Sequence, residues 1–301
     1  MNEQATGFFP IRTVSDITGV NSVTLRAWER RYGLIKPHRT AKGHRLYTQE
    51  DIELIQQILE LIDEGIPISR VRAVVQQTKT AAITTDEEAD IWQPHINAVI
   101  QAIAEFNEIA IERIYNEVLS LYPVDVVTRK LIVPLLKTLG DRWEAKQGSV
   151  AEEHFFGVYL RNKLGARFHH RQHYNNGPKL VAACLPNEQH EIGLLLFALA
   201  AHARGFQVVL LGGNMPIEEL ATVVKKTRAD AVVLSGSMPI NERNVFSTIQ
   251  QLVTDIEGPV FIGGRAATTY QNELVRIHAV PAGDDLVEGL KIIRNTLLKN
   301  Q

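Results

Sequence analysis

The sequence contains a single cysteine, Cys184, among its 301 residues. One thiol cannot close an internal disulfide, and without cysteine partners it is a poor candidate for a thiolate metal site. Long apolar runs are missing too. The longest, around residues 194–203, contains His202 and is too short to cross a bilayer, and no basic and apolar leader opens the chain. We therefore expect a cytoplasmic protein with an inert Cys184 and no membrane partner.

Net charge is also small, because 32 Lys and Arg stand against 34 Asp and Glu and give −2 at pH 7. This balance gives no global sign of nucleic-acid binding, so any basic surface has to be local. With 45% hydrophobic and 22% charged residues, the composition is typical of a globular protein long enough for two or three domains. No internal repeat and no separate catalytic constellation is recognisable, so we do not expect an enzyme.

Three blocks follow one another along the chain. Residues 8–77 combine short helical patterns with a basic stretch, and a polar, threonine-rich linker follows. In residues 90–172 apolar residues recur at helical spacing, which predicts a bundle of about four helices. In residues 178–301 short β-branched runs alternate with amphipathic stretches, which predicts a flavodoxin-like, doubly wound parallel sheet. Each expected strand is followed by a helix, and the strands cover residues 180–184, 207–211, 231–234, 260–262 and 278–280.

The first block has the pattern of a winged helix-turn-helix. One helix ends at Gly19 and a second begins at Ser22, and two short strands flank a Lys42-Gly43 tip. The next helix has Thr48 as its cap and Asp51 at the capping-box position. Residues 26–45 hold seven Lys and Arg but only one acid, and so many like charges repel one another unless a polyanion relieves them. We therefore predict that this block binds double-stranded DNA.

The sequence Thr-Leu-Arg-Ala-Trp-Glu-Arg-Arg-Tyr-Gly-Leu at residues 24–34, with Arg-Thr-x-x-Gly-His-Arg-Leu-Tyr at 39–47, resembles the winged-helix domain of the MerR family. The resemblance implies that Thr24, Arg26 and Arg30 face the major groove, and that His44, Arg45 and Tyr47 of the wing hold the backbone. Arginine suits both tasks because its planar fork pairs two acceptors at once. The remaining residues expected to bind DNA are Arg31 and Arg39. Leu25 and Trp28 are expected in the core.

Many MerR relatives dimerise through one long helix after the DNA domain. Here residues 67–77 run directly into the linker, so that device is missing. We expect a homo-oligomer, a dimer or a tetramer, to form through the later domains.

The third block carries a second candidate site. Ligands of open α/β sheets bind beyond the carboxyl ends of the strands. The loops that follow the first four expected strands contain, in order, His190, Gly213, the pair Ser235 and Ser237, and the pair Gly263 and Gly264. Small residues on three loops leave room for a long ligand tail, and a histidine stands at the mouth of the fourth.

Glu188-x-His190-x-x-Gly193, then forty-one residues to Ser235-x-Ser237, then twenty-five to Gly263-Gly264, resembles the cobalamin signature of methionine synthase, mutases and corrinoid proteins. The resemblance implies that His190 is the lower axial ligand of the cobalt, and that the serine and glycine loops line the nucleotide tail. A carboxylate beside the histidine can fix its tautomer. Glu188 stands where the commonest form of the signature has aspartate.

The middle block contains Trp143 and, ten residues later, Glu153-His154. This spacing resembles the light-dependent CarH and LitR regulators, in which a helical bundle covers the upper face of adenosylcobalamin. The resemblance implies that Trp143, Glu153 and His154 lie near the adenosyl group. In those photoreceptors a histidine follows the tryptophan and takes the cobalt's upper face after illumination. Glu144 occupies that position here, so a bis-histidine state through it is not available.

The sequence therefore predicts a transcription regulator whose operator binding is controlled by adenosylcobalamin or another cobalamin, with light as the trigger by resemblance. RNA polymerase is considered as a further partner. A regulator that senses cobalamin level or a partner protein without photochemistry is an alternative, supported by Glu144. A corrinoid carrier for a methyltransferase is a third, against which the winged helix argues.

Overall fold

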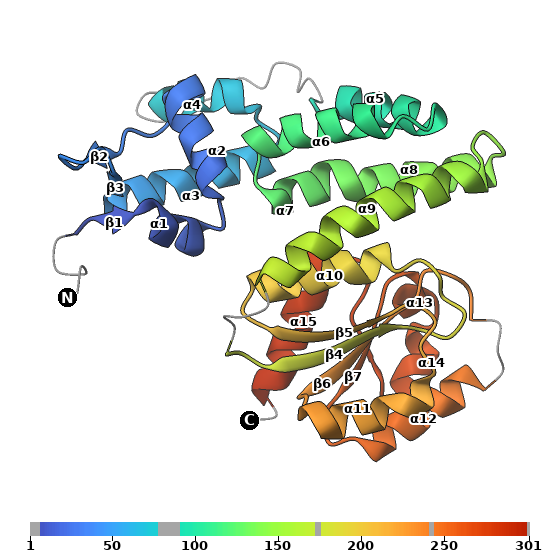
Figure 1. Cartoon of the computed structure of the whole chain (residues 1–301). Coiled ribbons are helices and arrows are strands. Elements are labelled where there is room, and N and C mark those ends of the chain that lie inside the picture. The colour runs from blue at the N-terminus through green and yellow to red at the C-terminus, as the bar shows by residue number, and fades with distance from the viewer. Residues whose placement is uncertain (1–6, 78–90, 172–175, 241–243, 300–301) are drawn as a thin grey trace. The chain divides into compact units, whose positions relative to one another are not determined.

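The computed structural model describes residues 7–77, 91–171, 176–240 and 244–299 (Figure 1). The chain divides into two compact units, one running to Phe156 and the other starting at Gly157. Among the described helices, none combines the length and the apolar character that a membrane span requires.

The first unit begins with the predicted helix-turn-helix. Helix α1 (Ile11–Thr18) ends at Gly19, which adopts a left-handed φ of 74° that an L-residue with a side chain rarely takes. Helix α2 (Ser22–Ala27) is capped by Asn21, whose side chain accepts hydrogen bonds from two backbone N–H groups of the first turn. The helix continues as a single π-helical turn, η2 (Trp28–Tyr32). The sequence prediction is confirmed for both helices.

The wing is a small antiparallel sheet in the order β1-β3-β2. Its strands are β1 (Phe9–Pro10), β2 (His38–Arg39) and β3 (Arg45–Tyr47). The two predicted wing strands are present, whereas β1 was not predicted because two residues are too short to show an alternating pattern. Thr48 then caps α3 (Gln49–Asp63) in a full capping box with Asp51, as predicted. Helix α4 (Ile68–Gln77) follows.

A group of helices forms the rest of the first unit, and the elements from α7 to α8 run on without a break. These helices are α5 (Trp92–Ala104), α6 (Glu108–Leu121), α7 (Val124–Val127), η3 (Thr128–Ile132), α8 (Val133–Glu144) and α9 (Val150–Arg171), of which α9 continues into the second unit. The apolar residues at helical spacing, among them Ile96, Ile103 and Leu135, are buried. The predicted bundle of about four helices is therefore present.

The second unit is a five-stranded parallel sheet in the order β5-β4-β6-β7-β8. Its strands are β4 (Lys179–Cys184), β5 (Gln207–Gly212), β6 (Ala231–Ser235), β7 (Val260–Gly263) and β8 (Val280–Pro281). The first four strands agree with the prediction to within a residue. The fifth was predicted two residues too early, because His278 takes a positive φ of 59° in the turn that precedes β8.

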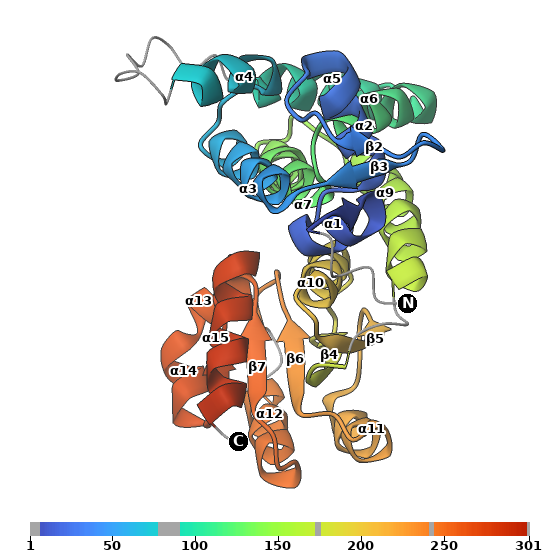
Figure 2. The ribbon, with the colours of Figure 1, turned by 90° about the vertical axis from the view of Figure 1, so that its left-hand side faces the viewer.

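Helices cover both faces of this sheet (Figure 2). They are α10 (Ile192–Ala203), η4 (Ile217–Glu219), α11 (Leu220–Thr227), α12 (Val245–Asp255), α13 (Arg265–Thr269), α14 (Gln271–Arg276) and α15 (Leu286–Lys299). Alternate residues of β4 pack into two separate cores, one with α10 and α15 and the other with α11 to α14. Cys184 is fully buried, and burial raises the pKa of its thiol to about 12. The fold is the predicted doubly wound one.

Replacing Thr48 by alanine tests the start of α3. The variant loses the side-chain acceptor for the Asp51 N–H, so we expect the free energy of unfolding of the first unit to fall by about 1 kcal/mol. Urea titration followed by tryptophan fluorescence measures the change. Thr48→Ser keeps a hydroxyl at the cap and should retain most of the stability; equal losses in both variants would contradict the capping account.

Candidate functional site

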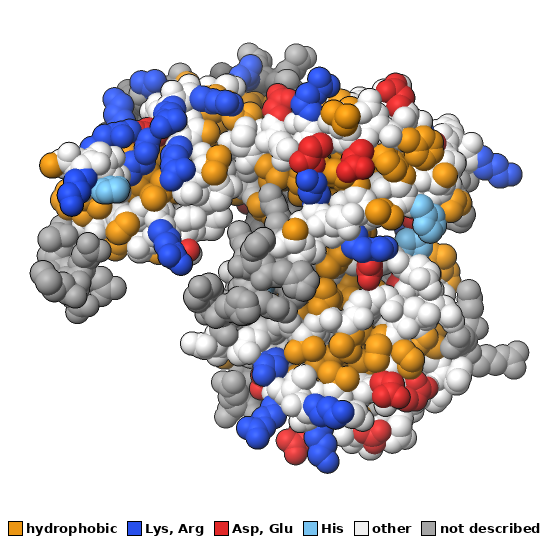
Figure 3. Space-filling view, in the orientation of Figure 1, with side chains coloured by type: hydrophobic (Ala, Val, Ile, Leu, Met, Phe, Trp, Pro, Cys, Tyr) orange, Lys and Arg blue, Asp and Glu red, His pale blue; other side chains and the backbone are white. Residues whose placement is uncertain are grey.

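Exposed cations gather on the winged-helix elements (Figure 3). Five of the eight residues predicted to bind DNA are exposed, namely Arg26, Arg30, Arg31, Arg39 and His44. Lys36 and Lys42 extend the same basic stretch. A local basic surface thus exists although the net charge of the chain is −2.

The other three predicted DNA-binding residues are not presented at the surface. Thr24 is 0% exposed, and its hydroxyl lies 3.4 Å from the Leu119 carbonyl oxygen of α6. Tyr47 is also fully buried, and burial raises its pKa to about 12. The Arg45 side chain is only 12% exposed and binds Glu29. In this conformation Thr24 cannot reach a base edge, because α6 covers its face of α2. We call α2 and its continuation η2 the recognition helix.

Trp28 shares that covered face of the helix, one turn after Thr24. It is fully buried, as predicted for a core residue, and so is Leu25. Its indole Nε1 donates a hydrogen bond of 2.8 Å to the carbonyl oxygen of Leu121, at the end of α6. An ion pair of 2.6 Å between Arg129 of η3 and Asp63 of α3 also joins the helical bundle to the winged-helix elements. Sequence alone could not reveal these contacts, since the Trp28 partner lies 93 residues away.

In the second unit, the loops predicted to carry a ligand meet at the carboxyl edge of the sheet. Backbone hydrogen bonds run from Leu185 to Ser235 at 2.9 Å and from Gly236 to Gly263 at 3.1 Å. The loop after β5 joins them, because the Asn214 N–H donates to the Glu188 carbonyl oxygen at 2.9 Å. Four strands therefore bring their following loops together, as the rule for open α/β sheets requires.

Glu188 holds two of these loops together. Its side chain is 3% exposed, and one carboxylate oxygen accepts hydrogen bonds from the His190 backbone at 2.8 Å and ring Nδ1 at 2.7 Å. The other oxygen accepts from Ser237 N at 2.6 Å, Ser237 Oγ at 2.7 Å and Met238 N at 3.0 Å. Burial alone would raise the pKa of Glu188, but the hydrogen bonds from His190 and Ser237 outweigh it and lower the pKa to about 2. The group is therefore an ionised carboxylate at neutral pH.

This carboxylate also decides the tautomer of His190. An ionised carboxylate only accepts hydrogen bonds, so Nδ1 carries the ring proton of a neutral imidazole. The lone pair of that imidazole then lies on Nε2, the atom through which a metal would bind. The His190 side chain is 48% exposed. The pair of residues therefore orients an accessible histidine at the mouth of the loops.

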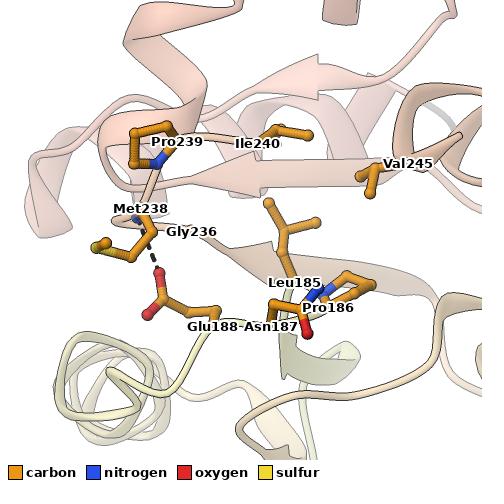
Figure 4. Close-up of a pocket in the computed structure, with 9 residues that line it drawn as sticks. All are labelled: Leu185, Pro186, Asn187, Glu188, Gly236, Met238, Pro239, Ile240 and Val245. Atoms are coloured by element: carbon orange, nitrogen blue, oxygen red, sulfur yellow. Dashed lines mark hydrogen bonds between the residues drawn. The ribbon is translucent and has the colours of Figure 1, made fainter. Parts of the chain in front are cut away.

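A pocket of about 340 Å³ opens beside Glu188 (Figure 4). It is lined mostly by apolar residues of the loops after β4 and β6 and of the start of α12: Leu185, Pro186, Asn187, Glu188, Gly236, Met238, Pro239, Ile240 and Val245. In Figure 4 the Glu188 side chain extends toward the Met238 backbone, where the dashed hydrogen bond is drawn. An apolar hollow with a few convergent polar groups is the usual form of a cofactor site.

The predicted glycines have different surroundings. Gly264 has a φ of 80°, and a Cβ there would lie 2.7 Å from the Gly236 carbonyl oxygen, so the backbone itself requires glycine. A Cβ on Gly213 would lie 3.2 Å from the Glu188 carbonyl oxygen, whereas one on Gly263 would meet only Gly283 at 3.9 Å. Gly193, in the first turn of α10, faces open space. Gly264 therefore serves close packing of the loops whether or not a ligand is bound.

Two polar contacts beside His190 were not predicted. Arg161 of α9 forms an ion pair of 2.5 Å with Glu191, and Asn187 N donates to Asn214 Oδ1 at 2.8 Å. No spacing in the sequence signals either contact, because each joins segments that meet only in the folded unit. They fix the His190 loop from two further sides.

The predicted cap residues lie in the bundle. Glu153 is partly buried and His154 is exposed, both in the first two turns of α9. The side chains of Trp143 and Glu144, at the end of α8, lie outside what the structure describes.

Comparison with known proteins identifies the domains that carry the two candidate sites. Residues 9–78 match the model of MerR helix-turn-helix regulatory proteins, and residues 95–167 and 178–291 match two models of B12-binding domains. The chain is 31% identical to the transcriptional repressor CarH of Myxococcus xanthus over 293 residues, which cover 92% of this chain and 96% of CarH. It is 27% identical to CarA of the same organism, over 95% of this chain and 97% of CarA.

Among solved structures, the monomethylamine corrinoid protein of Methanosarcina barkeri matches with a TM-score of 0.55. It is 20% identical and covers 67% of this chain and 98% of that protein, which shows a shared fold. The regulator relatives and the domain matches together imply that this chain binds DNA and a cobalamin. The chain therefore belongs to the MerR-type helix-turn-helix transcription regulators with B12-binding domains, the family of CarH and CarA.

Proposed function

We propose that adenosylcobalamin bound at His190 controls the DNA binding of this regulator, and that light is the signal that removes the control. The observation that carries the proposal is the Glu188 carboxylate, which orients His190 and ties it to the Ser237 loop. When bound, the cofactor supplies a cobalt–carbon bond that light can break.

The residues at the sheet edge fit such a group. His190 offers Nε2 as a lower ligand because Glu188 engages Nδ1, and a carboxylate partner of this kind raises the basicity of a ligating histidine. Ser235, Ser237, Gly213, Gly263 and Gly264 lie on chain segments that meet at the carboxyl edge of the sheet. The apolar pocket beside Glu188 is lined by other residues, mainly of the loops after β4 and β6. Small residues that meet at one edge leave room for a long nucleotide tail. We assign the tail to these residues.

The bundle supplies the cap in this proposal. Trp143, Glu153 and His154 would cover the upper face of the corrinoid, as their spacing suggests. Loss of a bulky upper group would remove a contact of the bundle with the cofactor, and the bundle would respond by moving. Glu144 replaces the histidine of the photoreceptors, so the state after illumination would need a different upper ligand.

A second candidate keeps the DNA-binding role but makes the chain a sensor of cobalamin level without photochemistry. Glu144 is the residue that favours it. In either case we propose a double-stranded operator as the target, a homodimer or homotetramer as the active form, RNA polymerase as a further partner, and the cytoplasm as the location.

The recognition helix offers a route from sensor to DNA. Because Trp28 and Thr24 pack directly on α6, movement of the bundle would displace the helix that carries Arg26 and Arg30. We propose that this contact couples the two functions, with no intermediate element between α6 and the DNA-reading surface.

Replacing His190 by alanine tests the cofactor site. We expect retention of adenosylcobalamin to weaken at least about tenfold and its absorption spectrum to differ from that of the wild type. Light should then no longer change DNA affinity, whereas cofactor-free DNA binding stays. Absorption spectra and gel shifts, in the dark and after illumination, provide the measurement. An unchanged spectrum with an unchanged response would refute the site, and a His190-dependent spectrum without any effect of light would favour the level sensor.

Replacing Glu188 by glutamine tests the carboxylate without any cofactor. An amide cannot accept five hydrogen bonds, and it leaves donors of the Ser237 loop unsatisfied, so we expect the second unit to lose about 1–3 kcal/mol of unfolding free energy. Urea titration of the cofactor-free chain measures this loss. Glu257→Gln, at an exposed acid of the same unit, is the matched control and should change stability by less than about 0.5 kcal/mol. Equal stability of both variants would contradict the account.

Replacing Trp28 by phenylalanine tests the coupling route. The variant keeps an aromatic ring but loses the hydrogen bond to Leu121, so the recognition helix should respond less to the bundle. We expect the ratio of DNA affinities before and after illumination, or with and without corrinoid, to fall toward one. A ratio equal to that of the wild type, in a variant that still folds, would show that signalling bypasses this contact.

A further inference from the structure

Glu29 is the only acid in a stretch, from Arg26 to Arg45, that otherwise carries seven cations. It lies in η2, the turn that continues the recognition helix. Its carboxylate is 15% exposed and makes two ion pairs, with Arg39 Nη2 at 2.7 Å and with Arg45 Nε at 2.5 Å. The two arginines belong to β2 and β3, so one side chain of the helix binds both strands of the wing.

The two arginines face each other across the wing. Arg39 and Arg45 are directly paired in the antiparallel register of β2 and β3. Like charges directly opposite one another destabilise an antiparallel pair. The Glu29 carboxylate lies on both cations at once and offsets their repulsion. Without it, the short β2–β3 pairing would hold two adjacent positive charges with nothing between them.

The Arg45 side chain binds Glu29 and is largely buried. Its side chain is 12% exposed, and its buried Nη2 has no hydrogen-bond partner among the described residues. Burial raises the pKa of Glu29, but the hydrogen bonds and charges of Arg45 and Arg39 lower it below the ordinary value. Arg39, by contrast, is half exposed and can face a phosphate while it remains paired.

From this arrangement we infer that Glu29 is a positioning residue for DNA binding: it fixes the wing against the recognition helix so that both can engage one DNA surface together. The inference rests on the DNA-binding function of the chain. Glu29 would then strengthen DNA binding, although its negative charge alone would weaken the attraction of this basic surface for DNA.

A role through charge alone and a positioning role for Glu29 predict opposite changes in DNA affinity when the residue is replaced. If Glu29 acts only through its charge, its removal adds one unit of positive charge and frees two arginines for phosphates. DNA binding should then tighten, and its dependence on salt should steepen by about 0.9 for each added phosphate contact. If Glu29 positions the wing, its removal loosens the wing, so binding should weaken and its salt dependence should become shallower.

The test uses the full chain and a short DNA duplex that the wild type enriches from a random-sequence library, with fluorescence anisotropy at several salt concentrations. We expect Glu29→Gln to weaken binding by about tenfold, the equivalent of one charged hydrogen bond. The slope of log affinity against log salt should become shallower. Tighter or equal binding of Glu29→Gln with an equal or steeper slope would overturn the inference.

Two further variants keep the result interpretable. Glu29→Asp retains the charge but is too short to hold both arginines as glutamate does; we expect weaker binding than the wild type, and wild-type binding would overturn the inference even if Glu29→Gln fails to fold. Glu50→Gln removes an exposed acid at the start of α3 and should change affinity little. Failure of the wild type itself to bind any duplex would instead contradict the DNA-binding function.

Discussion

The cofactor half of this protein depends on one buried carboxylate. A carboxylate on a side chain that is only 3% exposed is strongly destabilised unless donors surround it, and Glu188 receives five hydrogen bonds from residues on two loops. Those loops are 49 residues apart in sequence and follow neighbouring strands. Stabilising the buried negative charge therefore requires that the two loops meet, and their meeting also sets the orientation of His190 and forms part of the pocket wall.

A largely buried carboxylate also connects separate segments in the DNA-binding half. Glu29 joins the recognition helix to both wing strands, much as Glu188 joins the histidine loop to the serine loop. In each case a largely buried anion accepts hydrogen bonds from two segments that are separate in the sequence. Within the first unit, the contact of Trp28 with α6 links the DNA-reading helix to the bundle. Adjacent residues of one helical turn, Trp28 and Glu29, thus contact the bundle and the wing within the first unit.

Local signals in the sequence were sufficient to predict most of the helices and strands. Gly19, Asn21 and Thr48 mark helix ends through backbone conformation and capping, which neighbouring residues determine, and β-branched runs mark the strands of the sheet. Within the sites, the Glu188–His190 pair was predictable because its partners are two residues apart. The burial of Thr24 and Tyr47 and the Arg161–Glu191 pair were not, because each depends on a distant segment that occupies a particular face. His278 shows the same limit on a smaller scale, since its left-handed turn overrides a β-like pattern.

We propose above that His190, held by Glu188, would supply the nitrogen that binds the cobalt of the corrinoid. Electron paramagnetic resonance of the chain loaded with corrinoid in its cobalt(II) form reports that nitrogen directly, because ¹⁴N and ¹⁵N split the cobalt lines differently. If the protein is labelled with ¹⁵N-histidine and the corrinoid is not, the account predicts the doublet splitting of ¹⁵N. A triplet splitting from ¹⁴N, the nitrogen of the corrinoid's own base, would contradict it.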